Sequence, residues 1–173
     1  MSLRTFADPT EWTITQSDLE LFQSRLRDFV PPGAFDAHAH WYDLRHLLDD
    51  GAPIDQPEVG HDAMLSSTRR WMGDRATTEG LYFGFPIRTV DCAAENRFVA
   101  DQVRDHSGCR GLMLIRPDDD PAESEQTLIT DGFSGFKVYH VFAEREDSFH
   151  CEQGEFLPDW AWEIADRRGL DSV

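Results

Sequence analysis

The sequence predicts an α/β protein built on a parallel β-sheet. Segments with strand-like and helix-like patterns alternate four times between residues 34 and 168, an order typical of parallel sheets with right-handed crossovers. Residues 111–115 form a nearly continuous apolar run, as expected for a strand that is covered on both faces. Two architectures are compatible with this order: an open doubly wound sheet, and a (β/α)8 barrel of TIM type, of which the chain would carry about the first four β/α units.

The segment after the first predicted strand bears on this choice. A doubly wound sheet that binds a dinucleotide has a glycine-rich loop at this point. Here the strand is followed by Trp41, Tyr42, Asp43 and Leu44, with no glycine. The sequence therefore argues against a dinucleotide site.

Residues 1–33 are expected to form an N-terminal extension with one helix, and residues 34–173 the first half of the barrel. The run Ser17-Asp18-Leu19-Glu20 matches a capping box, and Pro31-Pro32-Gly33 is expected to end the helix. Between these signals lies an apolar stripe at helical spacing. It consists of Leu19, Phe22, Leu26 and either Phe29 or Val30.

Three later segments share the character of strands: residues 80–85, residues 111–115 and a part of residues 133–142. Asp120 followed by Pro121 matches the start of a helix, and Gly169 matches the end of one. The predicted helices span residues 61–72, 92–105, 121–130 and 158–168, with a short helix within 41–48 and a fifth strand beginning at 170–173.

The charge balance excludes some classes of partner. The chain has 33 acidic and 16 basic residues, a formal net charge of −17, so it lacks the basic surface that nucleic acids and anionic membranes require. No apolar run reaches the length of a transmembrane helix, and residues 1–8 lack the apolar core of a signal peptide. Three cysteines without metal or disulfide spacing fit a reducing environment, so a cytoplasmic location is expected.

Lys137 is the only lysine in the chain, since the other 15 basic residues are arginines. A lysine can hold a substrate carboxylate, act as a buried general base or become carboxylated. Arginine can hold a carboxylate, but it does not readily act as a general base or become carboxylated. The alternative is that a single lysine stands at this position by chance in a lysine-poor sequence. We rank electrostatic work at a substrate or metal site above carboxylation.

The strongest chemical signal is the segment Phe35-Asp36-Ala37-His38-Ala39-His40. Strand alternation puts Asp36, His38 and His40 on one face, so the two imidazoles are expected to converge as ligands of a borderline metal such as zinc. Asp36 would then orient an imidazole or only accept backbone N–H groups. The alternative for His38 and His40 is the polar face of an ordinary edge strand.

Other candidates lie where predicted strands end, because sites in parallel α/β folds form at the carboxyl ends of strands. Arg88 and Arg116 could clamp a substrate carboxylate, or pair with acidic side chains of the protein. Tyr139 and Trp41 are candidates for substrate contact, although Trp41 equally fits a core position. His140 is a candidate metal ligand or proton carrier, or an ordinary loop histidine.

Two motifs together resemble the amidohydrolase superfamily, in particular its amidohydrolase-2 branch of metal-dependent TIM-barrel hydrolases and decarboxylases. The first is the segment from Phe35 to His40. The second is Gly132-Phe133-Ser134-Gly135-Phe136-Lys137-Val138-Tyr139, which is similar to the branch pattern Gly-Phe-x-Gly-φ-Lys-φ-His, with Tyr139 in place of the usual histidine. The resemblance implies zinc or a similar ion on His38 and His40, a further histidine after strand five and an aspartate after strand eight.

These observations predict a metal-dependent hydrolase that acts on a small, carboxylated substrate through a metal-activated water. Lys137 and His140 would serve catalysis, and Arg88, Arg116, Tyr139 and Trp41 would contact the substrate. The alternatives are a decarboxylase of the same branch, or a truncated, non-catalytic half-barrel that needs a partner chain. We expect the barrel to be completed by a missing C-terminal half or by a homo-oligomer.

Overall fold

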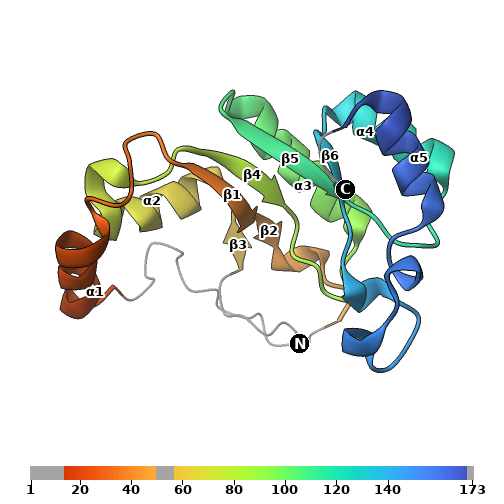
Figure 1. The fold of residues 1–173 in the computed structure, drawn as a ribbon, viewed down its shortest axis with the longest axis horizontal. Coiled ribbons are helices and arrows are strands. Elements are labelled where there is room, and N and C mark those ends of the chain that lie inside the picture. Colours follow the sequence, from red (N-terminus) through yellow and green to blue (C-terminus); the bar gives the residue numbers. More distant parts are fainter. Residues whose placement is uncertain (1–13, 50–56, 171–173) are drawn as a thin grey trace.

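The computed structural model describes residues 14–49 and 57–170, which form a four-stranded parallel sheet (Figure 1). The strands lie side by side in the order in which the chain forms them, whereas a doubly wound sheet reverses direction at a switch point. The order is compatible with a part of an α/β barrel and argues against the doubly wound alternative. From one edge to the other, the strands are β1 (Phe35–His40), β4 (Glu79–Phe83), β5 (Cys109–Leu114) and β6 (Gly135–Lys137).

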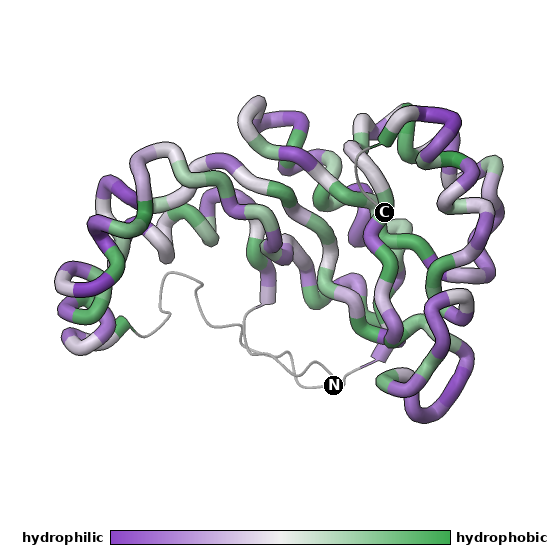
Figure 2. The backbone as a smooth tube through the Cα atoms, in the orientation of Figure 1, coloured by the Kyte–Doolittle hydropathy of each residue, from purple (hydrophilic) through white to green (hydrophobic). Residues whose placement is uncertain are grey.

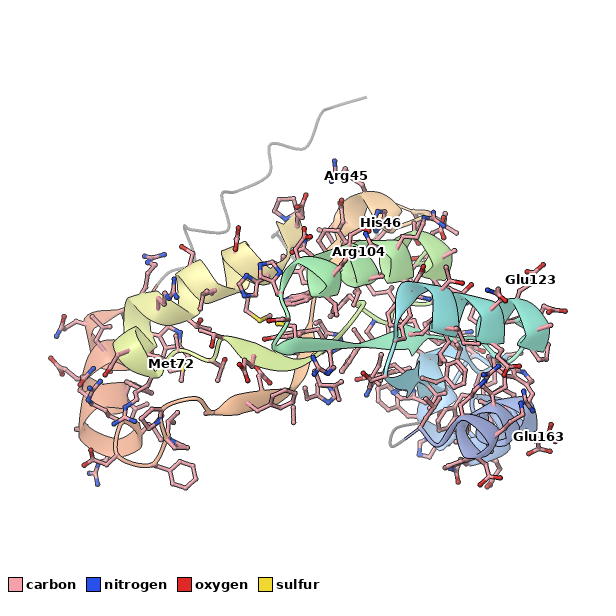
Figure 3. All side chains as sticks on the ribbon, turned by 90° about the horizontal axis from the view of Figure 1, so that it is seen from above. Arg45, His46, Met72, Arg104, Glu123 and Glu163 are labelled. Carbon is pink, nitrogen blue, oxygen red and sulfur yellow. The ribbon has the colours of Figure 1, made fainter. Side chains whose placement is uncertain are left out.

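The helices that connect these strands are α2 (His61–Met72), α3 (Cys92–Asp105) and α4 (Pro121–Asp131), followed by α5 (Asp159–Arg168). Figure 3 shows that α2, α3 and α4 lie along the same side of the sheet. We call this side the helix face and the opposite side the open face. No helix among the described residues is long and apolar enough to cross a membrane.

The hydrophobic core lies between the sheet and the helices that cover its helix face. Figure 2 shows apolar stretches along the central strands, whereas the helices alternate between apolar and polar residues. Alternation along each strand separates the two faces: Tyr82 and Phe136 belong to this core, and their neighbours Phe83 and Lys137 meet on the open face. Trp160 of α5 packs edge-on against Phe136, with ring centroids 5.8 Å apart.

The helix ends confirm most of the predicted capping signals. The Asp120 carboxylate accepts hydrogen bonds from two backbone N–H groups in the first turn of α4, at 2.9 Å each, and Pro121 follows it. Gly169, with φ of 63°, ends α5 as predicted. The left-handed backbone at this position suits glycine because it has no Cβ.

The first helix, α1 (Gln16–Leu21), begins earlier than predicted. Thr15 is its N-cap: its hydroxyl accepts from the Asp18 backbone N–H at 3.2 Å, and the Asp18 carboxylate accepts from the Thr15 backbone N–H at 2.8 Å. The prediction that Ser17 opens the capping box was therefore wrong. Thr15 to Asp18 and Ser17 to Glu20 both place a hydroxyl side chain three residues before a carboxylate, so the sequence does not separate them.

The predicted apolar stripe of this first helix is interrupted after Phe22. The backbone N–H of Arg27 donates to the Phe22 carbonyl at 2.8 Å, five residues back, so one wide π-type turn inserts a residue into the helical period. Phe22 stays buried against Trp71 of α2, with ring centroids 5.4 Å apart, whereas Phe29 is 82% exposed. The wide turn has rotated the end of the stripe away from the core.

The segment after β1 also differs from the prediction. The short helix expected within residues 41–48 is replaced by β2 (Tyr42–Asp43) and a single 3₁₀ turn at Leu44–His46. β2 pairs in antiparallel fashion with β3 (Glu58–Val59). This small second sheet precedes α2.

Two predicted strands are shorter than expected. The strand within residues 80–85 ends at Phe83, and the strand within residues 133–142 contains only three residues, because the chain turns into a 3₁₀ helix at His140–Phe142. The predicted fifth strand lies outside the described residues apart from Leu170.

Asn96 of α3 compensates for a gap in the sheet. Pairing between β4 and β5 stops at Tyr82 and Gly111, which leaves Leu114 further along β5 without a β4 partner. The Asn96 side chain, 3% exposed, donates to the Leu114 carbonyl and accepts from the Leu114 backbone N–H, both at 2.8 Å. One buried amide thus satisfies two backbone groups, as buried polar groups require.

Asn96→Ala should lower the free energy of unfolding by about 2–4 kcal/mol, because both Leu114 backbone groups lose their partner inside the core. The neighbouring exposed variant Arg97→Ala should change it by less than about 0.5 kcal/mol. Urea unfolding at pH 7 measures both values. Equal effects of the two variants would contradict the proposed bridging role.

Candidate functional site

An extra residue in β1 decides which side chains reach the open face. Asp36 is level with Gly80 of β4, and Ala39 is level with Tyr82, so β1 advances by three residues where β4 advances by two. This bulge puts Asp36 in phase with Ala39 and not with His40. The prediction that Asp36 shares a face with both histidines was therefore wrong.

The Asp36 carboxylate has a local role. It accepts a hydrogen bond from the His38 backbone N–H at 3.1 Å, a donor that lies within the bulge. Burial raises the pKa of Tyr82, and the charges of Cys109 and Asp36 act in the same direction, which agrees with a position of Asp36 toward the helix face. Of the two alternatives drawn from the sequence, the structure has Asp36 accepting a backbone N–H.

His38 and His40 meet over the ring of Phe83 at the carboxyl end of β4. Their ring centroids lie 5.5 Å apart, and they lie 4.8 and 4.7 Å from the Phe83 centroid. Phe83 is only 1% exposed because polar side chains cover it on the open face. The structure thus brings the two predicted metal ligands together.

Lys137 reaches the same place from β6. Its Nζ lies 4.4 Å from the Phe83 ring centroid and 5.4 Å from that of Tyr139, so the predicted shared side of Lys137 and Tyr139 is confirmed. Burial lowers the pKa of Lys137. Within the described residues the ammonium makes no ion pair with a carboxylate and rests only on aromatic faces, a favourable but weak form of compensation.

The two imidazoles suit a zinc ion. Two rings on one tetrahedral zinc, with Zn–N bonds of about 2.0–2.1 Å, have centroids roughly 5.2 Å apart, close to the observed separation. His40 Nδ1 lies 2.9 Å from the Gly84 carbonyl; the carbonyl only accepts, so Nδ1 carries the proton and Nε2 keeps the lone pair. Burial lowers the pKa of His40, which favours the neutral form that binds metals.

The Gly84 carbonyl is itself held in place by Glu95 of α3. Glu95 is 1% exposed; one oxygen accepts from the Phe85 backbone N–H at 3.1 Å, and the other lies 2.7 Å from Nδ1 of His46. Figure 3 shows His46 beside α3. A Cβ on Gly84 would lie 2.2 Å from Glu95 Cγ, so the close approach requires glycine.

Trp41 lies in the core and not in a pocket. It is fully buried and stacks on Tyr82, with ring centroids 3.6 Å apart, on the helix face. This placement favours the core alternative over the predicted contact with substrate.

Arg88 and Arg116 tie together the loops that follow the strands. Arg88 donates to the carbonyls of Ala143 and Arg145, at 3.0 Å each. Arg116 donates to the carbonyls of Arg88 and Val90, at 2.9 Å each, and lies 4.5 Å from the Phe142 ring centroid. These donors are directed at backbone oxygens in place of the acidic side chains considered from the sequence, and they hold the loops around the strand ends.

His140 follows β6 but turns toward the next loop. Its Nδ1 lies 3.1 Å from the Ser148 hydroxyl oxygen, and its ring packs on Phe149 with centroids 4.6 Å apart. The Tyr139 ring links His140 to Lys137. Its centroid lies 5.5 Å from that of the His140 ring and 5.4 Å from Lys137 Nζ. The predicted candidates on β6 and after it therefore form a chain of contacts from Phe83 to this loop.

A second group of ligand side chains was not predicted. His61, Asp62 and His106 offer ligand atoms that all lie within 4.8 Å of one another, and they could hold a metal ion. His61 and Asp62 are adjacent in sequence, but His106 is separated from them by most of two helices and a strand, so no motif links them. The packing of α2 against the end of α3 creates the group.

Gly84→Ala should destabilise the protein by about 1–3 kcal/mol, because the new methyl group overlaps Glu95 and the surrounding core has to shift. Gly154→Ala is a matched control, since no atom lies within 4 Å of a Cβ at that exposed position. Thermal and urea unfolding measure both variants. A neutral Gly84→Ala would show that the Gly84–Glu95 contact is not tight.

The buried Glu95 should make stability depend on pH. Burial raises its pKa above the ordinary 4.5, against the effect of its hydrogen bonds from His46 and two backbone N–H groups. Above about pH 4.5 the folded state then binds more protons than the unfolded state, so the free energy of unfolding falls as pH rises. Relative to Glu95→Gln, the wild type should lose stability between pH 4.5 and 7 in urea unfolding; a relative gain over this range would contradict the burial argument.

Comparisons with known proteins bear on the fold. No protein-family model and no curated protein sequence matches the chain. A solved structure titled a probable 2-pyrone-4,6-dicarboxylic acid hydrolase from Acinetobacter baumannii, with citric acid bound, matches with a TM-score of 0.52 and 13% sequence identity. The match covers 81% of this chain and 48% of that hydrolase, so the chain spans about half the length of the protein it resembles. At this identity the likeness shows a shared α/β fold.

Proposed function

We propose that the chain forms the metal-binding half of a metal-dependent hydrolase of the amidohydrolase type, with zinc on His38 and His40 and a small carboxylated substrate. The observation that carries the proposal is the meeting of these two histidines with Lys137 over Phe83, at the carboxyl ends of three strands. In parallel α/β folds this is where chemistry takes place.

The charge of Lys137 supports a carboxylated substrate. A half-buried ammonium without an ion pair among the described residues is a ready partner for an anion, and a bound carboxylate would complete its electrostatic environment. The matched hydrolase is titled for a dicarboxylic acid and contains citric acid. Both molecules are carboxylates, in line with this choice of substrate class.

Each residue of the proposed site has a separate task. His38 and His40 hold the ion, which when bound supplies an acidified water or polarises a carbonyl oxygen. Lys137 binds and orients the substrate carboxylate, and Tyr139 forms the floor beneath its ammonium. His140, beside Ser148, would carry a proton in the adjoining loop. Arg88 holds this loop through the carbonyls of Ala143 and Arg145, and Arg116 holds the segment after β4 through the carbonyls of Arg88 and Val90.

The proposed site needs residues from elsewhere. Two histidines leave open coordination positions on a zinc ion, and the family resemblance implies further ligands from strands five and eight. A continuation of the chain, a second copy or another polypeptide would supply them. The alternatives from the sequence remain: decarboxylation on the same site, or a half-barrel that binds a partner without turnover.

The test combines metal content with turnover. In an Asp62→Asn background, which weakens the other ligand cluster, the chain should bind one equivalent of zinc at the strand ends, and His38→Ala with His40→Ala should lose it. His150→Ala, an exposed loop histidine, is the control and should retain the ion. Mass spectrometry of metal content after dialysis measures the loss.

Turnover then separates the alternatives. With zinc and a pyrone dicarboxylate, ring opening that disappears in the double-histidine variant supports hydrolysis, whereas release of carbon dioxide supports the decarboxylase. Binding without turnover supports the non-catalytic half-barrel, and light scattering shows whether a second copy is present. A folded chain that binds no ion through His38 and His40 would refute the proposed site.

A further inference from the structure

The group formed by His61, Asp62 and His106 lies on the opposite side of the sheet from the proposed hydrolase site. The His61 ring lies 6.0 Å from Trp41, which stacks on Tyr82 in the core of the helix face. His38 and His40 contact Phe83 on the open face. The two groups are therefore separate and cannot share one ion.

Gln102 of α3 positions both histidines. Its side-chain oxygen accepts from the His61 backbone N–H at 2.9 Å, and its backbone carbonyl lies 2.7 Å from Nδ1 of His106. Gly60 allows this approach, since a Cβ there would lie 2.5 Å from the Gln102 side-chain oxygen. One residue, Gln102, thus holds the first residue of α2 through its side chain and the residue that caps the end of α3 through its backbone carbonyl.

The Gln102 carbonyl also fixes the tautomer of His106. Because a carbonyl only accepts, Nδ1 of His106 carries the proton and its Nε2 presents a lone pair. That Nε2 lies 4.0 Å from Asp62 Oδ1, and the same oxygen lies 3.0 Å from Nδ1 of His61. A carbonyl behind the ring nitrogen that does not bind metal is the usual support of a histidine ligand.

The distances are close to those of a coordination shell. Ligand atoms of a tetrahedral zinc with bonds of about 2.0–2.1 Å lie roughly 3.3 Å apart. This value falls between the distances from Asp62 Oδ1 to His61 Nδ1, 3.0 Å, and to His106 Nε2, 4.0 Å. The two imidazoles stack with centroids 3.5 Å apart and planes 23° from parallel. Entry of an ion would move the two rings apart, with His106 pivoting on its hydrogen bond to Gln102, while the Asp62 side chain, 96% exposed, has room to adjust.

We propose that His61, Asp62 and His106 form a second site, for a borderline divalent transition-metal ion such as Zn²⁺ or Ni²⁺. Two imidazoles and one carboxylate are the donor set that these ions prefer, and the carboxylate supplies part of the charge that neutralises the ion. The site joins the start of α2 to the end of α3, so occupancy cross-links two helices that cover the same face of the sheet (Figure 1).

The test uses the full chain with His38→Ala and His40→Ala, so that it does not depend on the proposed hydrolase site. Calorimetric titration with Zn²⁺ and with Ni²⁺ should show one equivalent bound. His106→Ala should weaken binding at least about 100-fold, since even residues that only support a ligand contribute about 10- to 100-fold. Nitrogen NMR should show the Nε2 resonance of His106 shifting on addition of Zn²⁺.

Asp62→Asn is the decisive variant, because this exposed side chain can change without disturbing the fold. Asp62→Asn should weaken metal binding by at least about 10-fold, because even a residue that only supports a metal ligand contributes at least that much to the affinity. Asp101→Asn, an exposed acid of α3 paired with Arg104, is the matched control and should leave the affinity unchanged. Equal affinity of all variants, or no binding by the parent chain, would overturn the proposal.

Discussion

The parallel pairing of β1 with β4, with one extra residue in β1, is the constraint on which the arrangement of the site depends. Because side chains alternate along a strand, a shift of one residue exchanges its two faces. The bulge places Ala39 level with Tyr82 and His40 level with Phe83. Trp41 consequently stacks within the core, while both imidazoles reach the open face.

The end of pairing between β4 and β5, at Tyr82 and Gly111, explains part of the polarity around the carboxyl ends of these strands. Where neighbouring strands separate, their backbone groups lose partners, and buried groups of this kind must be satisfied in another way. The Asn96 amide bonds the N–H and carbonyl of Leu114, the Glu95 carboxylate accepts from the Phe85 N–H, and Arg116 donates to the Val90 carbonyl. Polar residues around the strand ends therefore do structural work, and among the described residues the charge of Lys137 differs in having only aromatic contacts.

The sequence was informative where a signal is local and read from adjacent residues. Apolar positions at helical spacing located α2 and α3, and Gly169 marked the end of α5. Strand alternation and the position of the only lysine pointed to His38, His40 and Lys137, which the structure brings together. The bulge in β1 and the wide turn after Phe22 have no such signature, since each adds one residue to an otherwise regular period. The burial of Trp41 and the hydrogen bonds from Arg88 to backbone carbonyls depend on contacts between segments that are distant in the sequence, and no local pattern encodes such contacts.

The two histidine groups share one feature and differ in another. In His40 and in His106 a backbone carbonyl holds Nδ1, so both rings present Nε2 to a ligand. His40 lies against the rings of Phe83 and Phe85, and the positive charge of Lys137 that acts on it would oppose a second cation. His106 faces the carboxylate of Asp62, which attracts one. Negative charge from a substrate carboxylate or from further ligands would therefore strengthen the binding of an ion on the open face, whereas the group on the helix face already contains a carboxylate.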